Sequence, residues 1–332
     1  MIESIHFKNF KALRDATLRL SPFTLLVGPN GSGKSTVLQA LEALSDRRRY
    51  EFPQVVTAGL HVDGEAESVE VSVKWGEPHP DVEPLLEWNR GTGVKRGNRP
   101  GTSGYNLVDR LLRQIRVYYL DADAIAKPVR LAKDMEIAPD GGGLSGVLTR
   151  LQDQHRERFE ALNEETTRWL PEFSGIQFDV DTDGNRVLQL RTRDGHHIIP
   201  AAGLSQGTLL ALAILTLAYL PEPPPLVGFE EPDRGLHPYL LQRVKDAMYR
   251  LAYPEDFGES RNPVQVIATT HSPYFLDLFK DRPEEIVVAN KRGLDVEFQR
   301  LSDQPHIQEV LGDAALGEVW YTGILGGVPA PP

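Results

Sequence analysis

One glycine-rich stretch, GPNGSGKST at residues 28–36, constrains the fold of this chain more than any other feature. It fits the pattern G-x-x-x-x-G-K-[ST], in which glycines let the backbone curl so that successive N–H groups face a phosphate. An apolar run at residues 23–27 precedes it, and apolar residues at helical spacing follow at 37–44. A strand, a loop and a helix in this order predict a phosphate-binding loop in an α/β fold.

The polar residues of this stretch have separate predicted tasks. Lys34 is expected to reach the β- and γ-phosphates of a nucleotide, and the Ser35 hydroxyl is expected to bind Mg²⁺. The remaining cofactor-binding residues curve the loop and begin the helix, whose positive end favours an anion. They are Asn30, Gly31, Ser32, Gly33 and Thr36.

Composition limits the other possibilities. The 332 residues, 40% of them hydrophobic and 25% charged, allow one large domain or two ordinary ones with a real core. The absence of cysteine excludes disulfides and thiolate metal sites. The first residues do not resemble a signal peptide, and the apolar run at 209–220 is too short for a membrane span. We therefore expect a cytoplasmic protein. Its net charge of −11 argues against broad nucleic-acid binding and leaves room for a local basic patch.

Two later motifs carry further candidate site residues. The stretch LSQGT at residues 204–208 begins an apolar helix, where Ser205 is a good N-cap and Gly207 permits close approach of a phosphate. The stretch PLVGFEEP at residues 225–232 is an apolar strand that ends in two acids. We expect Glu230 to orient Mg²⁺ and Glu231 to polarise the water that attacks the γ-phosphate.

These ordered motifs resemble those of the ABC-type ATPase heads in SMC-like, RecF-like and OLD-family proteins. Asn9-Phe10-Lys11 is similar to the N-F-[RK] element of those heads, and residues 231–238, EPDRGLHP, are similar to the E-P-E-x-G-L-H-P run of OLD and RecF-like ATPases. Glu230 departs from the usual aspartate by one methylene group. The THSP stretch at residues 270–273 resembles their switch-histidine segment.

The resemblance implies a fold and a set of roles. The fold is an α/β P-loop NTPase of the ABC-ATPase head type, with a mixed central sheet, an antiparallel β-subdomain and a helical lobe. His271 would touch the γ-phosphate and the attacking water, and Ser205 would complete the nucleotide site of an opposite protomer. Lys11 is either a phosphate contact or an ordinary exposed lysine.

The expected domain organisation is one ATPase head over residues 1–332. Residues 1–80 and 205–300 would form the nucleotide-binding lobe, and residues 81–204 an insertion or helical lobe. The second lobe ends at LSQGT, residues 204–208, which resembles the L-S-x-G signature motif of ABC ATPases. We also expect either a long surface loop or a partly ordered insertion at 78–104, and one helix over 144–170. Residues 326–332 are expected to be disordered.

The resemblance also implies a function. ATP and Mg²⁺ would bind, and hydrolysis would open and close a head-to-tail homodimer that serves DNA repair or anti-phage defence, with a separately encoded nuclease or effector as partner. The alternative is the nucleotide-binding subunit of a membrane transporter, which residues 231–238 disfavour. A self-contained OLD nuclease is a third class, for which the sequence after His271 leaves little room.

Two assignments stay open at this stage. The Mg²⁺-sensing glutamine of ABC ATPases has no clear equivalent, and Asp121, Asp123 and Gln54 are the candidates. The basic stretches at residues 47–49 and 95–99 are either solvated surface or contacts for DNA or a protein partner.

Overall fold

The chain forms two compact units. The computed structural model describes residues 1–57, 68–77, 81–98, 105–293, 295–305, 307, 314–323 and 325. The first unit comprises Met1–Val117, Pro224–Glu230 and Asn262–Pro332, and the second comprises Tyr118–Pro223 and Glu231–Arg261. These bounds differ from those of the predicted lobes, 1–80 with 205–300 and 81–204, whose functional meaning stays a prediction. The expected disorder at 326–332 lies outside the described residues.

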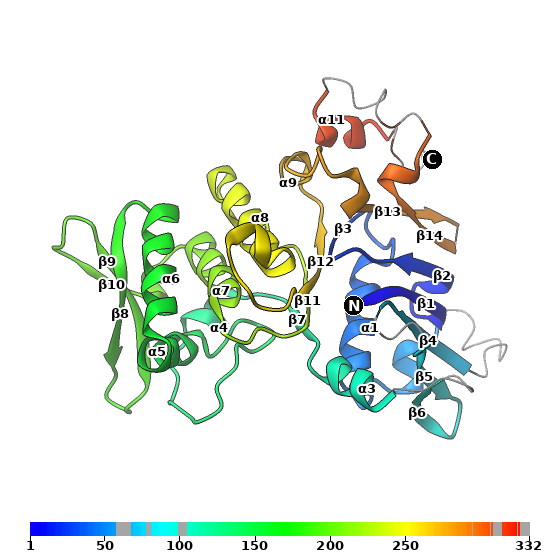
Figure 1. Ribbon diagram of the computed structural model, residues 1–332, viewed down its shortest axis with the longest axis horizontal. Helices are drawn as coiled ribbons and strands as arrows, with labels where there is room; N and C mark the ends of the chain where they lie inside the picture. The colour runs from blue at the N-terminus through cyan, green and yellow to red at the C-terminus, as the bar shows by residue number, and fades with distance from the viewer. Residues whose placement is uncertain are drawn as a thin grey trace. The chain divides into compact units, whose positions relative to one another are not determined.

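A six-stranded sheet, counted over the described residues, forms the centre of the first unit in the order β14-β13-β3-β12-β11-β7 (Figure 1). Strands β13, β3, β12 and β11 are mutually parallel, and β14 runs antiparallel to β13. Strands β3, β11 and β12 are buried along their whole length, as expected for parallel strands covered on both faces. The bounds are β3 Phe23–Val27, β7 Arg116–Tyr118, β11 Leu226–Phe229, β12 Gln265–Thr270, β13 Ile286–Arg292 and β14 Asp295–Arg300.

A five-stranded antiparallel sheet, again within the described ranges, completes the first unit in the order β2-β1-β4-β5-β6. The predicted long loop at 78–104 is wrong for residues 84–98, because they form the β5–β6 hairpin of this sheet. Leu86 and Trp88 alternate with exposed neighbours, and Gly91 and Gly93 take positive φ angles in the turn. The bounds are β1 Ile2–Phe10, β2 Leu13–Arg19, β4 Ser68–Trp75, β5 Pro84–Asn89 and β6 Gly93–Asn98.

Five helices accompany these sheets among the described residues of the first unit. The longest, α1, begins at Lys34 directly after the glycine-rich loop, and its Leu38 side chain lies beside Gly228 of β11. The bounds are α1 Lys34–Ser45, α2 Phe52–Val55, α3 Tyr105–Arg113, α9 Pro273–Asp277 and α11 Leu316–Tyr321.

The second unit packs helices with a small antiparallel sheet in the order β10-β9-β8. Helix α7 is apolar on every side and almost completely buried, so it is the core helix of this unit. The single helix predicted over 144–170 is wrong in one respect, because His155 leaves helical geometry and separates α5 from α6. The bounds are α4 Ala122–Ala126, α5 Leu144–Gln154, α6 Arg156–Trp169, β8 Phe173–Val180, β9 Arg186–Thr192, β10 Ile198–Pro200, α7 Gln206–Tyr219 and α8 Pro238–Ala252.

The predicted fold class is confirmed, since a mixed central sheet, an antiparallel β-sheet and a helical unit are all present. A search of the described helices for one long and apolar enough to cross a membrane finds none.

Candidate functional site

The glycine-rich loop after β3 has the shape that a phosphate cradle requires. Gly28, Gly31 and Gly33 all have positive φ angles, of 155°, 73° and 88°. The Lys34 side chain is buried, and its ammonium donates to the carbonyl oxygens of Gly28 at 2.8 Å and Pro29 at 3.0 Å. The loop therefore folds back over the lysine that the sequence assigned to phosphate binding.

The glycine-rich loop and two predicted site residues follow neighbouring parallel strands. Strand β12 lies between β3 and β11, and all three run in the same direction. Their carboxyl ends consequently bring the loop, His271 after β12 and Glu230 after β11 to one edge of the sheet. Ligands of open α/β sheets bind at this edge.

The two predicted metal ligands, Ser35 and Glu230, are in direct contact. The Ser35 hydroxyl donates a short hydrogen bond to Oε1 of Glu230, across the gap between helix α1 and strand β11. A search of the described residues finds no group of three or more acids or histidines able to hold a metal. One hydroxyl and one carboxylate fit Mg²⁺ in particular, because that ion commonly completes its shell with phosphate oxygens and water.

Glu231 has an unusual backbone conformation. Its φ of 45° makes it one of three non-glycine residues with positive φ among those described, the others being Asn9 and Lys11. It also precedes Pro232, and its carbonyl oxygen accepts a hydrogen bond from Arg234 N at 3.0 Å. Such a conformation costs on the order of 1–3 kcal/mol and is most often found at functional sites. Two of the three residues with this strain are residues that the sequence assigned to the site.

The segment around His271 is held by local hydrogen bonds. The Thr270 hydroxyl accepts from Ser272 N at 2.9 Å, and the Ser272 hydroxyl caps α9 by accepting from Phe275 N at 3.2 Å. His271 lies between these two bonded residues, so its backbone is fixed at the end of β12.

In the second unit, Ser205 is the N-cap of α7, as predicted from the sequence. Its hydroxyl oxygen accepts from Thr208 N at 3.1 Å, and the Ser205 side chain is exposed. Gly207 has a structural role beyond the predicted one, because a Cβ at this position would lie 2.9 Å from the Gly235 carbonyl oxygen. The signature segment therefore packs against the loop of residues 231–237.

A groove of about 470 Å³ lies beside this segment, lined among others by Leu204, Gln206 and Lys127. Both aspartates considered as Mg²⁺ sensors, Asp121 and Asp123, also line it. Asp121 caps α4 by accepting from Ala124 N at 2.8 Å. The third candidate, Gln54, closes the capping box of α2 by accepting from Glu51 N at 2.8 Å. Asp121 and Gln54 thus each have a local structural task.

Lys11 occupies a polar cluster on the first unit. Its ammonium lies 4.3 Å from the centre of the Tyr50 ring, a cation–π contact. Burial lowers the pKa of Lys11, and the nearby Glu42 carboxylate opposes that shift. Burial and the hydrogen bond to Glu42 raise the pKa of Tyr50 to about 12. Sequence reasoning missed this cluster, because nothing in the chain order relates Tyr50 to the N-terminal turn.

The two basic stretches differ in the structure. Arg47 and Arg48 are exposed, and Arg49 pairs with Glu42 at 3.1 Å. Arg96 is not a surface residue, because its side chain is 3% exposed, donates to the Leu44 carbonyl and pairs with Asp109 at 3.2 Å. The expected basic surface at 95–99 therefore loses Arg96, and Arg99 lies outside the described residues.

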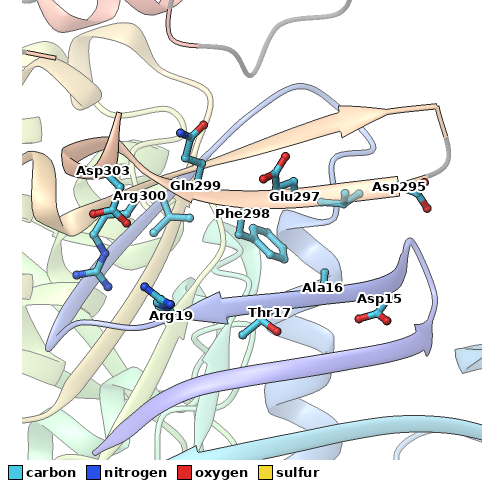
Figure 2. Close-up of a pocket in the computed structure, with 12 residues that line it drawn as sticks. Asp15, Ala16, Thr17, Arg19, Asp295, Glu297, Phe298, Gln299, Arg300 and Asp303 are labelled. Atoms are coloured by element: carbon cyan, nitrogen blue, oxygen red, sulfur yellow. The ribbon is translucent and has the colours of Figure 1, made fainter. Parts of the chain in front are cut away.

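A separate pocket of about 610 Å³ lies between β2 and β14 (Figure 2). Figure 2 shows acidic and basic side chains along both strands, among them Asp15, Arg19 and Glu297. The residues that line it among those described include none of the predicted site residues.

The sheet order and the glycine-rich loop place the chain in the class of P-loop NTPases. Residues 93–277, more than half of the chain, match the family described as "AAA domain, putative AbiEii toxin, Type IV TA system", and the chain belongs to this family. Residues 1–79 match a second family, described as "AAA ATPase domain".

A curated relative supports the same grouping. The chain is 25% identical over 369 residues to an OLD nuclease of Thermus scotoductus (strain ATCC 700910 / SA-01). This match covers 89% of the chain and 65% of the relative, so the chain spans less than two thirds of that protein's length.

Solved structures of SMC head domains share the fold. A SmcHead bound to the C-winged helix domain of ScpA has a TM-score of 0.62 at 18% identity, covering 90% of this chain and 96% of that one. The SMC head domain from Thermotoga maritima has a TM-score of 0.54 at 17% identity, covering 90% and 98%. Together the comparisons confirm the predicted resemblance to SMC-like and OLD-family ATPase heads.

Proposed function

We propose that this protein hydrolyses ATP with Mg²⁺ and uses the reaction to close and open a head-to-tail homodimer. The observation that supports this most strongly is the contact between Ser35 and Glu230 at the mouth of the phosphate loop. It brings the hydroxyl of Ser35 in α1 and the carboxylate of Glu230, directly after β11, to the place where the metal of a P-loop NTPase binds. Mg²⁺ held there would neutralise charge on the phosphates.

The chain's own groups account for the remaining chemistry. Lys34, now bonded to loop carbonyls, would exchange these bonds for phosphate oxygens. Glu231 would accept a hydrogen bond from the attacking water and orient it in line with the γ-phosphate. His271, at the end of β12, would contact the γ-phosphate and that water.

The dimer forms the second part of the proposal. Ser205 stands exposed at the N-terminus of α7, a helix of 14 residues. The helix dipole makes this end positive, which favours an anion there. Burial of α7 fixes this helix end within its own unit. We propose that it meets the γ-phosphate bound by the partner protomer, as implied by the resemblance to ABC-type heads.

We also propose that the protein acts in the cytoplasm in DNA repair or anti-phage defence, together with a nuclease supplied by another protein. The relative named as an OLD nuclease supports this choice over a transporter subunit. Arg47 and Arg48 are the exposed basic residues that we propose as a DNA contact, one formed only in the closed dimer because the chain carries a net charge of −11.

Phosphate release from ATP by the purified protein tests the core of the proposal. We expect turnover with Mg²⁺, none with EDTA, and a loss of turnover in Glu230→Gln. The matched control is Glu3→Gln, because Glu3 is an exposed acid on β1 of the same unit. Equal turnover in Glu230→Gln and the parent would contradict the metal site, and no ATP binding by the parent would contradict the function as a whole.

A further inference from the structure

The β13–β14 hairpin lies against the phosphate loop. Strand β13 pairs in parallel with β3 up to Val288 and Val27, and it then continues alongside the loop that follows β3. Ala289 and Lys291 are two residues apart on β13, so they point to the same face of the hairpin. Val296 of β14 is paired with Lys291 and shares that face.

Each of these three side chains meets a different glycine of the loop. A Cβ on Gly28 would lie 3.1 Å from the Ala289 Cβ and 2.6 Å from its carbonyl oxygen. A Cβ on Gly33 would lie 3.8 Å from Val296 Cγ1. A Cβ on Gly31 would lie 3.7 Å from the ammonium nitrogen of Lys291. One face of the hairpin is thus a wall for the loop, apolar at two positions and cationic at the third.

The wall is firmly anchored, which fixes the backbone that carries the lysine. Val296 is buried, and the centres of the Phe298 and Phe7 rings, the latter on β1, lie 6.3 Å apart. Figure 2 shows Phe298 directed from β14 toward β2, in the pocket between these two strands. Lys291 itself is exposed, and no ion pair with it is found among the described residues. Its ammonium therefore stands at the loop with its hydration largely intact.

We propose that Lys291 is a second nucleotide-binding cation, which contacts the phosphate chain at the crown of the loop and strengthens binding. This inference rests on the proposed function. Lys34 supplies the buried cation from α1, whereas Lys291 supplies an exposed one from β13. An exposed ammonium close to a polyphosphate gains a Coulomb attraction that salt screens.

Nucleotide affinity, measured with a fluorescent ATP analogue, tests the assignment. We expect Lys291→Ala to weaken binding about 3- to 10-fold at low salt, a loss typical of removing one exposed charge contact. The loss should shrink at high salt, and Lys291→Arg should restore most of the affinity. Lys74→Ala is the matched control, because Lys74 is an exposed lysine of β4 paired with Glu3. Unchanged thermal unfolding without nucleotide would separate a binding role from a structural one.

Two outcomes overturn the inference in different ways. Parent-like affinity in Lys291→Ala, with a parent that binds nucleotide, would remove Lys291 from the site and leave the proposed function intact. A parent that binds no nucleotide would overturn the proposed function and this inference together.

Discussion

The phosphate loop and the start of α7 are both glycine-containing helix starts, and they hold their polar groups in opposite ways. In the loop, Lys34 is buried and bonded to two carbonyls, and Ser35 is bonded to Glu230. At α7, Ser205 is exposed, and within the described part of the chain the hydrogen bonds of its hydroxyl are to Thr208. The first region is a loop closed around Lys34, whereas the second is an open helix end. The contrast teaches that the second region would need a ligand brought by another molecule, which agrees with the site shared between protomers that we propose.

The largest expected effect concerns the strained acid that follows Glu230. Glu231→Gln should keep ATP binding and lower turnover by about 100- to 10,000-fold, the range for loss of a general base. The neutral amide keeps the shape of the side chain and loses the charge that polarises water. Turnover and ATP binding are measured separately, with Glu255→Gln as a control at an exposed acid of the same unit. Turnover at the parent rate would sink the assignment.

The next effect concerns the open helix end. Ser205→Arg should leave single-site ATP binding intact and lower turnover by about 10- to 1,000-fold, the scale for removal of one stabilising contact to transition-state charge. Ser205→Thr preserves both the hydroxyl and the cap, so its turnover should stay near that of the parent. Parent-like turnover in Ser205→Arg would show that α7 has no part in catalysis.

A smaller effect compares glycines of the two regions through stability. Gly28→Ala adds a Cβ 2.6 Å from a carbonyl oxygen at a φ of 155°, so it should destabilise the first unit by about 3 kcal/mol. Gly207→Ala meets Gly235 O at 2.9 Å without a positive φ, and about 1–2 kcal/mol is expected. Gly91→Ala has a φ of 80° and open space around it, so it should cost only about 1 kcal/mol of strain. Urea unfolding without nucleotide measures all three, and equal losses would contradict the proposed packing of the loop.

The smallest effect decides between the two interpretations of Lys11. Lys11→Met should weaken ATP binding about 3-fold if the ammonium contacts phosphate, and leave binding unchanged if it serves only Tyr50. The pH dependence of stability gives a second measurement. Burial lowers the pKa of Lys11 in the folded protein below 10.5, its ordinary value in the unfolded chain. At pH values between the folded-state pKa and 10.5 the unfolded chain binds more protons than the folded one, so stability rises with pH. Lys11→Met should abolish that rise.

The sequence predicted those parts of the site that depend on neighbours in the chain. The glycine spacing, the N-cap at Ser205 and the acids after β11 are local signals. In the structure the glycines and Ser205 lie where α1 and α7 begin, and the acids follow β11. Features that depend on strand order could not be predicted in this way. The approach of Lys291 to Gly31 requires β13 to pair with β3, and the burial of Arg96 requires it to reach Asp109. The β5–β6 hairpin was missed because prolines and glycines around it resemble a loop.

The central claim is that each nucleotide site combines the loop of one protomer with α7 of the other. Turnover in a mixture of Lys34→Ala and Ser205→Arg proteins tests it most directly, because a mixed dimer has one site with both defects and one with neither. We predict that the mixture hydrolyses ATP faster than either variant alone, reaching up to about half the rate of a parent dimer when mixed dimers form. Turnover no higher than that of the separate variants, in a mixture where crosslinking detects mixed dimers, would contradict the shared site.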